Sequence, residues 1–110
     1  MSTRPRPYSP YAAEAALLLG AQIRLARRER RWSQQELAER IGVTARTVSK
    51  IEHGELSVSL GGAFEAAALL GVGLLGVERS RLGDELDRVR ARGALLSRPS
   101  RRGDGPHDDF

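Results

Sequence analysis

The chain has 110 residues, enough for one domain with tails, and a formal net charge of +4. A basic balance suits nucleic acid or an anionic membrane surface as partner. It decides little here, because 17 of the 18 basic residues are arginine and a GC-rich genome alone would enrich arginine. With no cysteine and two distant histidines, a disulfide framework, a metal site or a catalytic constellation has little to build from.

We therefore expect no enzyme, no cofactor and no metal. No run reaches the roughly 18 apolar residues of a membrane span. Arg4 to Pro7 interrupt any signal-peptide core, so we expect a cytoplasmic protein without a membrane partner.

The N-terminal segment predicts an extended arm that gives way to a helix. Three prolines stand among the first ten residues, so we assign residues 1–11 to a disordered arm. Arg4 and Arg6 would suit a minor groove, with simple disorder as the alternative. From Tyr11 to about Arg31 the pattern is helical. The expected core stripe of this helix is Leu19, Ile23 and Ala26.

Two short helices around a glycine turn are predicted next. Ser33 and Glu36 form a capping-box pattern, and the apolar stripe Leu37, Ala38 and Ile41 follows. Gly42 suits the left-handed end of that helix.

Thr44 would cap the following helix, which we expect to end near His53, with Gly54 as its stop. Val48 and Ile51 face inward in this helix. The side chains expected to point away from the core are Ala45, Arg46, Ser49 and Lys50. This build is typical of a helix-turn-helix, which places its second helix in the DNA major groove; a generic helical hairpin is the alternative.

A fourth helix is predicted from Leu60 to Leu70, capped by Ser57 or Ser59 and ended by Gly71. We expect Phe64, Ala67, Ala68 and Leu70 to close the core over the helix that Thr44 caps. An apolar turn follows, framed by Gly71, Gly73 and Gly76 and holding Val72, Leu74, Leu75 and Val77. It would pack on the fourth helix or join a dimer contact.

A final amphipathic helix is predicted from Ser80 to about Arg92, with Leu82, Leu86 and Val89 on one face and charges on the other. Its apolar face would dock on its own domain, a twin chain or a different protein. Residues 97–110 are polar and predict a disordered tail ending in Phe110, either a peptide ligand or an inert tail.

The stretch from Leu19 to Leu70 resembles the XRE family of phage repressor and Cro proteins. The matching residues are Ile23, Arg24, Arg27, Ser33, Gln34, Leu37, Ala38, Gly42, Val43, Thr47, Val48, Ser49, Ile51, Glu52 and Gly54. The resemblance implies an all-α chain: a compact five-helix lambda-repressor-like domain over residues 12–78, an amphipathic helix over 79–96 and disordered tails. It also implies a homodimer on a palindromic double-stranded DNA operator, in the bacterial cytoplasm and at the nucleoid when bound.

The resemblance assigns roles to single residues. It implies base reading by Ala45, Arg46, Ser49 and Lys50, and phosphate binding by Gln34, Thr44 and Thr47. By their positions at helix ends, Arg28 and His53 are further candidates for phosphate binding; a solvated helix end is the alternative for Arg28 and a plain helix C-terminal histidine for His53. Gln34 would also brace the third helix. Arg27 and Glu52 correspond to a partly buried structural ion pair. In such a role Arg46 would donate to a guanine O6 and N7.

The overall layout also resembles the HipB-like antitoxins, a branch of the XRE family. That resemblance implies a HipA-like kinase toxin as partner, its neutralisation, and repression of the shared operon. The residues expected at a partner or dimer contact are Leu74, Leu82, Leu86, Val89 and Phe110. A solitary XRE-family regulator and a protein-only adaptor that uses the fold are the alternatives.

Overall fold

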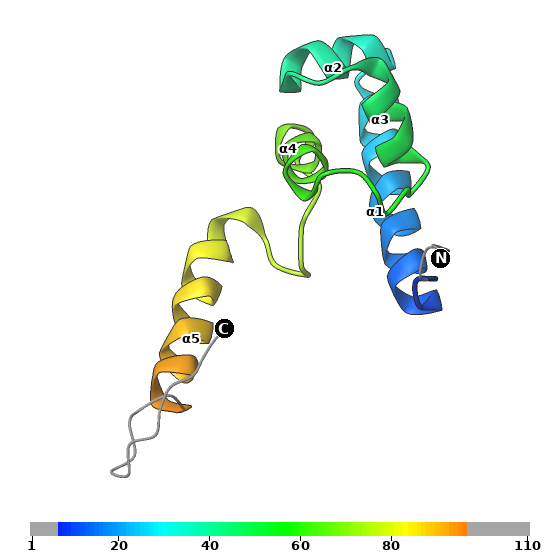
Figure 1. Cartoon of the computed structure of the whole chain (residues 1–110). Helices are drawn as coiled ribbons and strands as arrows, with labels where there is room; N and C mark the ends of the chain where they lie inside the picture. The colour runs from blue at the N-terminus through cyan, green and yellow to red at the C-terminus, as the bar shows by residue number, and fades with distance from the viewer. Residues whose placement is uncertain (1–6, 97–110) are drawn as a thin grey trace. The chain divides into compact units, whose positions relative to one another are not determined.

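The computed structural model describes residues 7–96, over which the chain is helical and has no strand. Its contacts divide the chain into a first unit, up to Leu74, and a second unit, from Leu75. The prediction of an all-α chain built on a helix-turn-helix domain is confirmed. The first unit holds α1 (Pro10–Glu29), α2 (Gln34–Ile41), α3 (Ala45–Glu52) and α4 (Leu60–Leu70); the second holds the 3₁₀ helix η1 (Arg79–Arg81) and α5 (Leu82–Leu96), drawn in Figure 1.

The predicted amphipathic helix is thus itself the fifth α-helix of the chain. Residues 1–6 and 97–110, which include most of the expected arm and the whole expected tail with Phe110, lie outside the described residues.

Helix α1 begins at Pro10, one residue before the predicted start at Tyr11. It ends at Glu29, two residues before the predicted end near Arg31. Ser9 accepts a hydrogen bond from the Ala12 backbone N–H at 3.2 Å, and Pro10 suits the first helical turn. At the other end Arg31 adopts a left-handed conformation, with φ of +62°. That conformation usually belongs to glycine, so the sequence carried no stop signal there.

The boundaries of α2 and α3 follow the predicted caps. Ser33 accepts from the Glu36 backbone at 3.0 Å, while the Glu36 carboxylate accepts from the Ser33 backbone at 2.7 Å, which confirms the capping box. Gly42 is left-handed, with φ of +75°. Thr44 accepts from the Thr47 backbone at 3.1 Å. Because both helices start at side-chain caps, the turn between them has a fixed geometry.

All four helices of the first unit contribute to its core. The fully buried large side chains are Ile23 from α1, Leu37 from α2 and Val48 from α3, and Ile51 is nearly so. The predicted Leu19 and Ala26 pack at its edge.

Helix α4, capped by Ser59, contributes a different face from the one predicted. Its buried residues are Ala63, Ala66, Ala67 and Leu70. The assignment of Phe64 and Ala68 to the core is wrong, since both are only half-buried and lie outside the core cluster. The helix is apolar around most of its circumference, so its sequence pattern does not single out an inward face.

Gly20 lets α1 approach the end of α3 closely. A Cβ built on Gly20 would lie 2.4 Å from the Ile51 carbonyl oxygen and 2.7 Å from that of Glu52. Real Cβ atoms essentially never come so near another atom. The path of α3 across α1 therefore depends on the missing side chain at this position.

The second unit exposes its helix. Helix α5 starts at Leu82, after η1, and continues to Leu96 instead of ending near Arg92, because Ala94, Leu95 and Leu96 are good helix formers. None of its residues is buried. None of the helices in the described part of the chain is both long and apolar enough for a membrane span.

Candidate nucleic-acid interface

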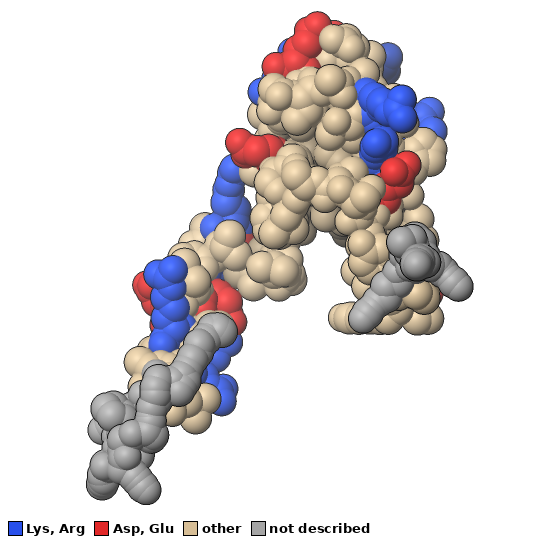
Figure 2. Space-filling model, in the orientation of Figure 1, with Lys and Arg blue, Asp and Glu red and all other residues tan. Residues whose placement is uncertain are grey.

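Helix α3 turns one face to the core and another to solvent. Val48 and Ile51 are buried, whereas Arg46 is exposed and Lys50 is half-buried. Within residues 7–96 the side chains of Arg46 and Lys50 make no hydrogen bond or ion pair, so both charges remain available to a ligand. Figure 2 shows basic side chains gathered over α3 on the face in view.

Ala45 is placed differently from the prediction. It was expected to point away from the core, but it is half-buried and packs against the core cluster. Its methyl group therefore belongs partly to the packing that seats the first turn of α3. The predicted outward set reduces to Arg46, with Ser49 and Lys50 partly covered.

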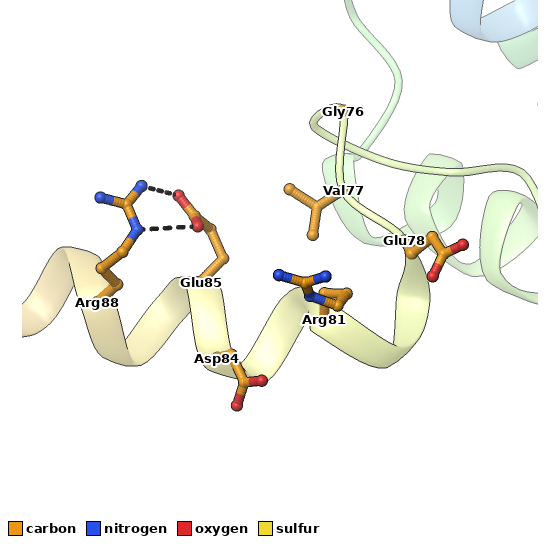
Figure 3. Close-up of a pocket in the computed structure, with 7 residues that line it drawn as sticks. All are labelled: Gly76, Val77, Glu78, Arg81, Asp84, Glu85 and Arg88. Carbon is orange, nitrogen blue, oxygen red and sulfur yellow. Dashed lines mark hydrogen bonds and ion pairs between the residues drawn. The ribbon is translucent and has the colours of Figure 1, made fainter.

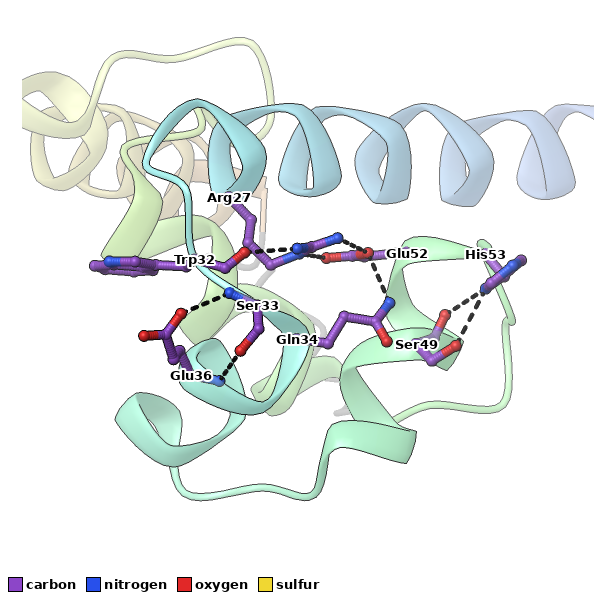
Figure 4. A network of polar contacts seen from close by, with 8 residues as sticks. All are labelled: Arg27, Trp32, Ser33, Gln34, Glu36, Ser49, Glu52 and His53. Carbon is purple, nitrogen blue, oxygen red and sulfur yellow. Dashed lines mark hydrogen bonds and ion pairs between the residues drawn. The ribbon is translucent and has the colours of Figure 1, made fainter.

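A buried ion pair ties the end of α3 to α1. Arg27 donates from Nε to Glu52 Oε2 at 2.6 Å and from the guanidinium NH2 group to Oε1 at 3.0 Å. Both residues are 8% exposed. Two parallel charge-assisted hydrogen bonds fix the guanidinium and carboxylate in one plane, seen edge-on in Figure 4.

The same pair is anchored to the start of α2. Gln34 donates its side-chain amide to Glu52 Oε1 at 3.0 Å, and Arg27 donates its remaining NH1 group to the Trp32 carbonyl at 2.7 Å. Gln34 therefore lies where the brace was predicted, between the first turn of α2 and the end of α3. Because α1, α2 and α3 meet at one satisfied network, α3 is held in a single orientation.

Local hydrogen bonds occupy several of the expected phosphate ligands. Thr44 donates its hydroxyl to that of Thr47 at 3.1 Å. The His53 Nδ1 lies 2.7 Å from the Ser49 carbonyl oxygen, so Nδ1 carries the proton and donates it there. His53 is exposed, which leaves Nε2 as its outward-facing nitrogen.

The arginines at the end of α1 divide into two kinds. Arg28 is exposed and has no ion-pair partner in the described region, as expected of a phosphate ligand. Arg30 instead donates to the Leu69 carbonyl of α4 at 3.1 Å. Its guanidinium carbon also lies 5.2 Å from the centre of the Trp32 ring, and that of Arg40 lies 4.1 Å from it.

Sequence reasoning missed this Arg30 contact, because nothing local to α1 marks which of its arginines reaches α4.

A hollow of about 510 Å³ lies in the second unit, between the turn at Gly76 and α5. Figure 3 shows its lining, in which Glu85 accepts two hydrogen bonds from Arg88. These bonds, with the charge of Arg88, lower the pKa of Glu85 below its ordinary value, against a smaller opposing effect of desolvation. No group of three or more His, Cys, Asp or Glu that would hold a metal ion occurs in residues 7–96.

One comparison with known proteins identifies a domain in this part of the chain. The family model described as helix-turn-helix matches residues 23–77, half of the chain. The matched span includes the whole of α2, α3 and α4, and the part of α1 that carries Arg27. No curated protein and no solved structure matches the chain significantly.

Proposed function

The chain belongs to the helix-turn-helix family and is a DNA-binding regulator of the XRE type; on that premise, we propose that it is a sequence-specific transcriptional repressor. The observation that carries the proposal is the state of α3, which is locked by a buried network at one end and exposes unpaired cations beside it. A rigid helix with free cations suits major-groove readout, since it requires little reordering on binding.

In the proposed complex Arg46 donates two hydrogen bonds to a guanine, and Ser49 and Lys50 lie beside it in the major groove. Thr44, Thr47, His53 and Arg28 contact phosphates around them. Two chains present their α3 helices about 34 Å apart, one DNA turn, to a palindromic operator. The bound dimer represses by occupying the promoter.

The test begins with selection of the operator from a random duplex library. Arg46→Ala should weaken binding to the selected operator by about 1–3 kcal/mol and leave random DNA nearly unaffected. Arg46→Lys is the matched control for charge: it keeps the cation but loses the guanidinium fork. If Arg46→Ala weakens both DNAs equally, Arg46 is a phosphate ligand and α3 does not read bases through it.

A second candidate function is the antitoxin of a type II pair that neutralises a HipA-like kinase toxin and represses its own operon. An exposed apolar stripe along α1 favours this antitoxin role. Tyr11, Leu18 and Leu25 recur at every seventh residue along α1 and are all exposed. Such a stripe on the DNA-binding unit suits a protein partner.

Co-expression with the product of the adjacent gene tests this role. A neighbour that is toxic alone, and that copurifies with the wild-type chain, supports the antitoxin. Leu18→Glu should then release it while operator binding persists. A harmless neighbour that does not copurify leaves a solitary XRE-type repressor. Absence of any selected DNA sequence would instead favour the protein-only adaptor.

A further inference from the structure

Helix α5 carries an apolar stripe with the spacing of a helix-pairing seam. Leu82, Leu86, Val89, Gly93 and Leu96 follow one another at alternating steps of four and three residues. The four large side chains among them are 38%, 48%, 55% and 86% exposed. An apolar repeat of 3.5 residues that faces solvent is the pattern of a helix that pairs with another helix.

The charges of α5 change sign along its length. Asp84, Glu85 and Asp87 lie in its N-terminal half, and Arg88, Arg90 and Arg92 follow. A parallel copy of this helix would place acid beside acid and arginine beside arginine at each level of the pair, with a Glu85–Arg90 contact across the seam as the exception. An antiparallel copy places each half beside its opposite, and it also opposes the two helix dipoles.

We propose that the occupant of this face is a second copy of the chain, whose α5 packs antiparallel on the first. This deepens the proposed function, on which it rests, because it supplies the dimer that a palindromic operator requires. The seam covers about two heptads, so the dimer is weak alone and is strengthened when both copies bind one DNA.

The seam fixes the register. Leu86 packs opposite Val89 of the second copy, and Leu82 packs opposite its Gly93, where no side chain blocks the approach. In this register Glu85 lies beside Arg92 of the second copy, between the Leu82–Gly93 and Leu86–Val89 contacts, and forms an ion pair with it. The two-fold symmetry of the dimer repeats this ion pair. Glu85 can accept from Arg92 as well as from Arg88, because a carboxylate has about four acceptor sites.

An apolar hollow receives the end of the second helix. It measures about 560 Å³ and is lined mainly by Leu75, Val77, Leu82, Leu86 and Val89. In the proposed register Leu96 of the second copy lies one turn before Leu82, against Leu75 and Val77. Leu75 is 78% exposed and holds a φ of +59°, an unfavourable conformation for leucine that presents its side chain at the rim of this hollow.

The test is the self-association of the full chain, measured by sedimentation equilibrium. Glu85→Arg and Arg92→Glu should each weaken dimerisation on the order of tenfold, since each change turns two symmetric attractions into repulsions. The double variant Glu85→Arg/Arg92→Glu should restore it. Asp84→Arg, also in the first turn of α5 but outside the seam, is the matched control and should change it less than about twofold.

Three results would overturn the proposal. The first is a wild-type chain that stays monomeric at the highest soluble concentration. The second is a dimer that survives Leu86→Arg, which would place the contact elsewhere. The third is rescue of Glu85→Arg by Arg90→Glu and not by Arg92→Glu, because in a parallel pair Glu85 meets Arg90.

The two proposals fail separately. Arg46→Ala should abolish base reading and leave self-association intact. Leu86→Arg should leave a folded monomer that still distinguishes half-sites from random DNA but no longer binds the full operator cooperatively.

Discussion

Gly20 of α1 lies directly against Ile51 of α3, so near that a Cβ on the glycine would sit 2.4 Å from the isoleucine carbonyl oxygen. The Ile51 carbonyl oxygen belongs to the backbone, so it cannot rotate away from an added Cβ as the end of a flexible side chain could. The orientation of the helix that carries Arg46 therefore depends on the missing side chain at Gly20 as well as on the buried network around Glu52.

Gly20→Ala should destabilise the first unit by at least about 2 kcal/mol, because α1 and α3 must separate to admit the Cβ. Urea denaturation followed by circular dichroism measures it. Gly61→Ala is the matched control, since Gly61 also lies in a helix but has no atom within 4 Å of its Cβ position. The control should be neutral or stabilising by up to about 1 kcal/mol. Equal stability of the two variants would show that the close approach is not maintained.

Removing one partner of the buried ion pair should cost more than removing both. Arg27→Met or Glu52→Leu alone leaves a buried charge uncompensated and should destabilise by about 3–5 kcal/mol. The double variant Arg27→Met/Glu52→Leu should be clearly less destabilised than the two single costs added together. Chemical denaturation of all four proteins closes the cycle. Simple additivity would mean that the pair is not coupled.

Arg28→Ala should weaken binding to operator and to random DNA alike, because an arginine that binds phosphate reads no sequence. The slope of log K against log salt should fall in magnitude by about 0.9 per bound chain, and so by about 1.8 for the dimer on its operator, because each chain then neutralises one phosphate fewer. Fluorescence anisotropy over a salt series measures both quantities. Arg81→Ala, an exposed arginine of the second unit, should leave the slope unchanged. A specific loss at the operator only would reassign Arg28 to base reading.

Acid should loosen α5 through Glu85. Its pKa is lowered by the hydrogen bonds from Arg88, so the helical form favours the ionised carboxylate. This stabilisation is complete above the unfolded-state pKa of Glu85 and is lost as the pH falls through the lowered, folded-state value. The chain should lose helicity over that acidic range, as measured by circular dichroism. The Glu85→Gln variant should lose less helicity over the same range. An identical acid transition in wild type and Glu85→Gln would remove the role of this pair.

Much of the helix-turn-helix could be predicted because its signals are local. The capping box at Ser33, the left-handed Gly42 and the cap at Thr44 each depend on residues within one turn of each other. The Arg27–Glu52 contact joins residues far apart in sequence. It was accessible only through the resemblance to the XRE family.

The features that sequence reasoning missed depend on long-range packing or on unusual backbone. Arg31 ends α1 without a glycine. The buried face of α4 is chosen by what packs on it, not by its nearly uniform apolar pattern. Likewise, nothing near Ala45 indicates that the core reaches the first turn of α3, so the predicted outward set included one residue that is partly inside.

Trp32, the only tryptophan of the chain, also gives the protein a built-in optical reporter. It sits at the junction of α1 and α2, the guanidinium groups of Arg30 and Arg40 lie over its ring, and its own carbonyl accepts from Arg27. Its emission therefore follows the opening of the braced end of α3. Helix α5 has no aromatic residue, so its melting is silent in fluorescence and visible in circular dichroism. Comparing the two signals on one sample separates loss of the DNA-reading unit from loss of the proposed pairing helix.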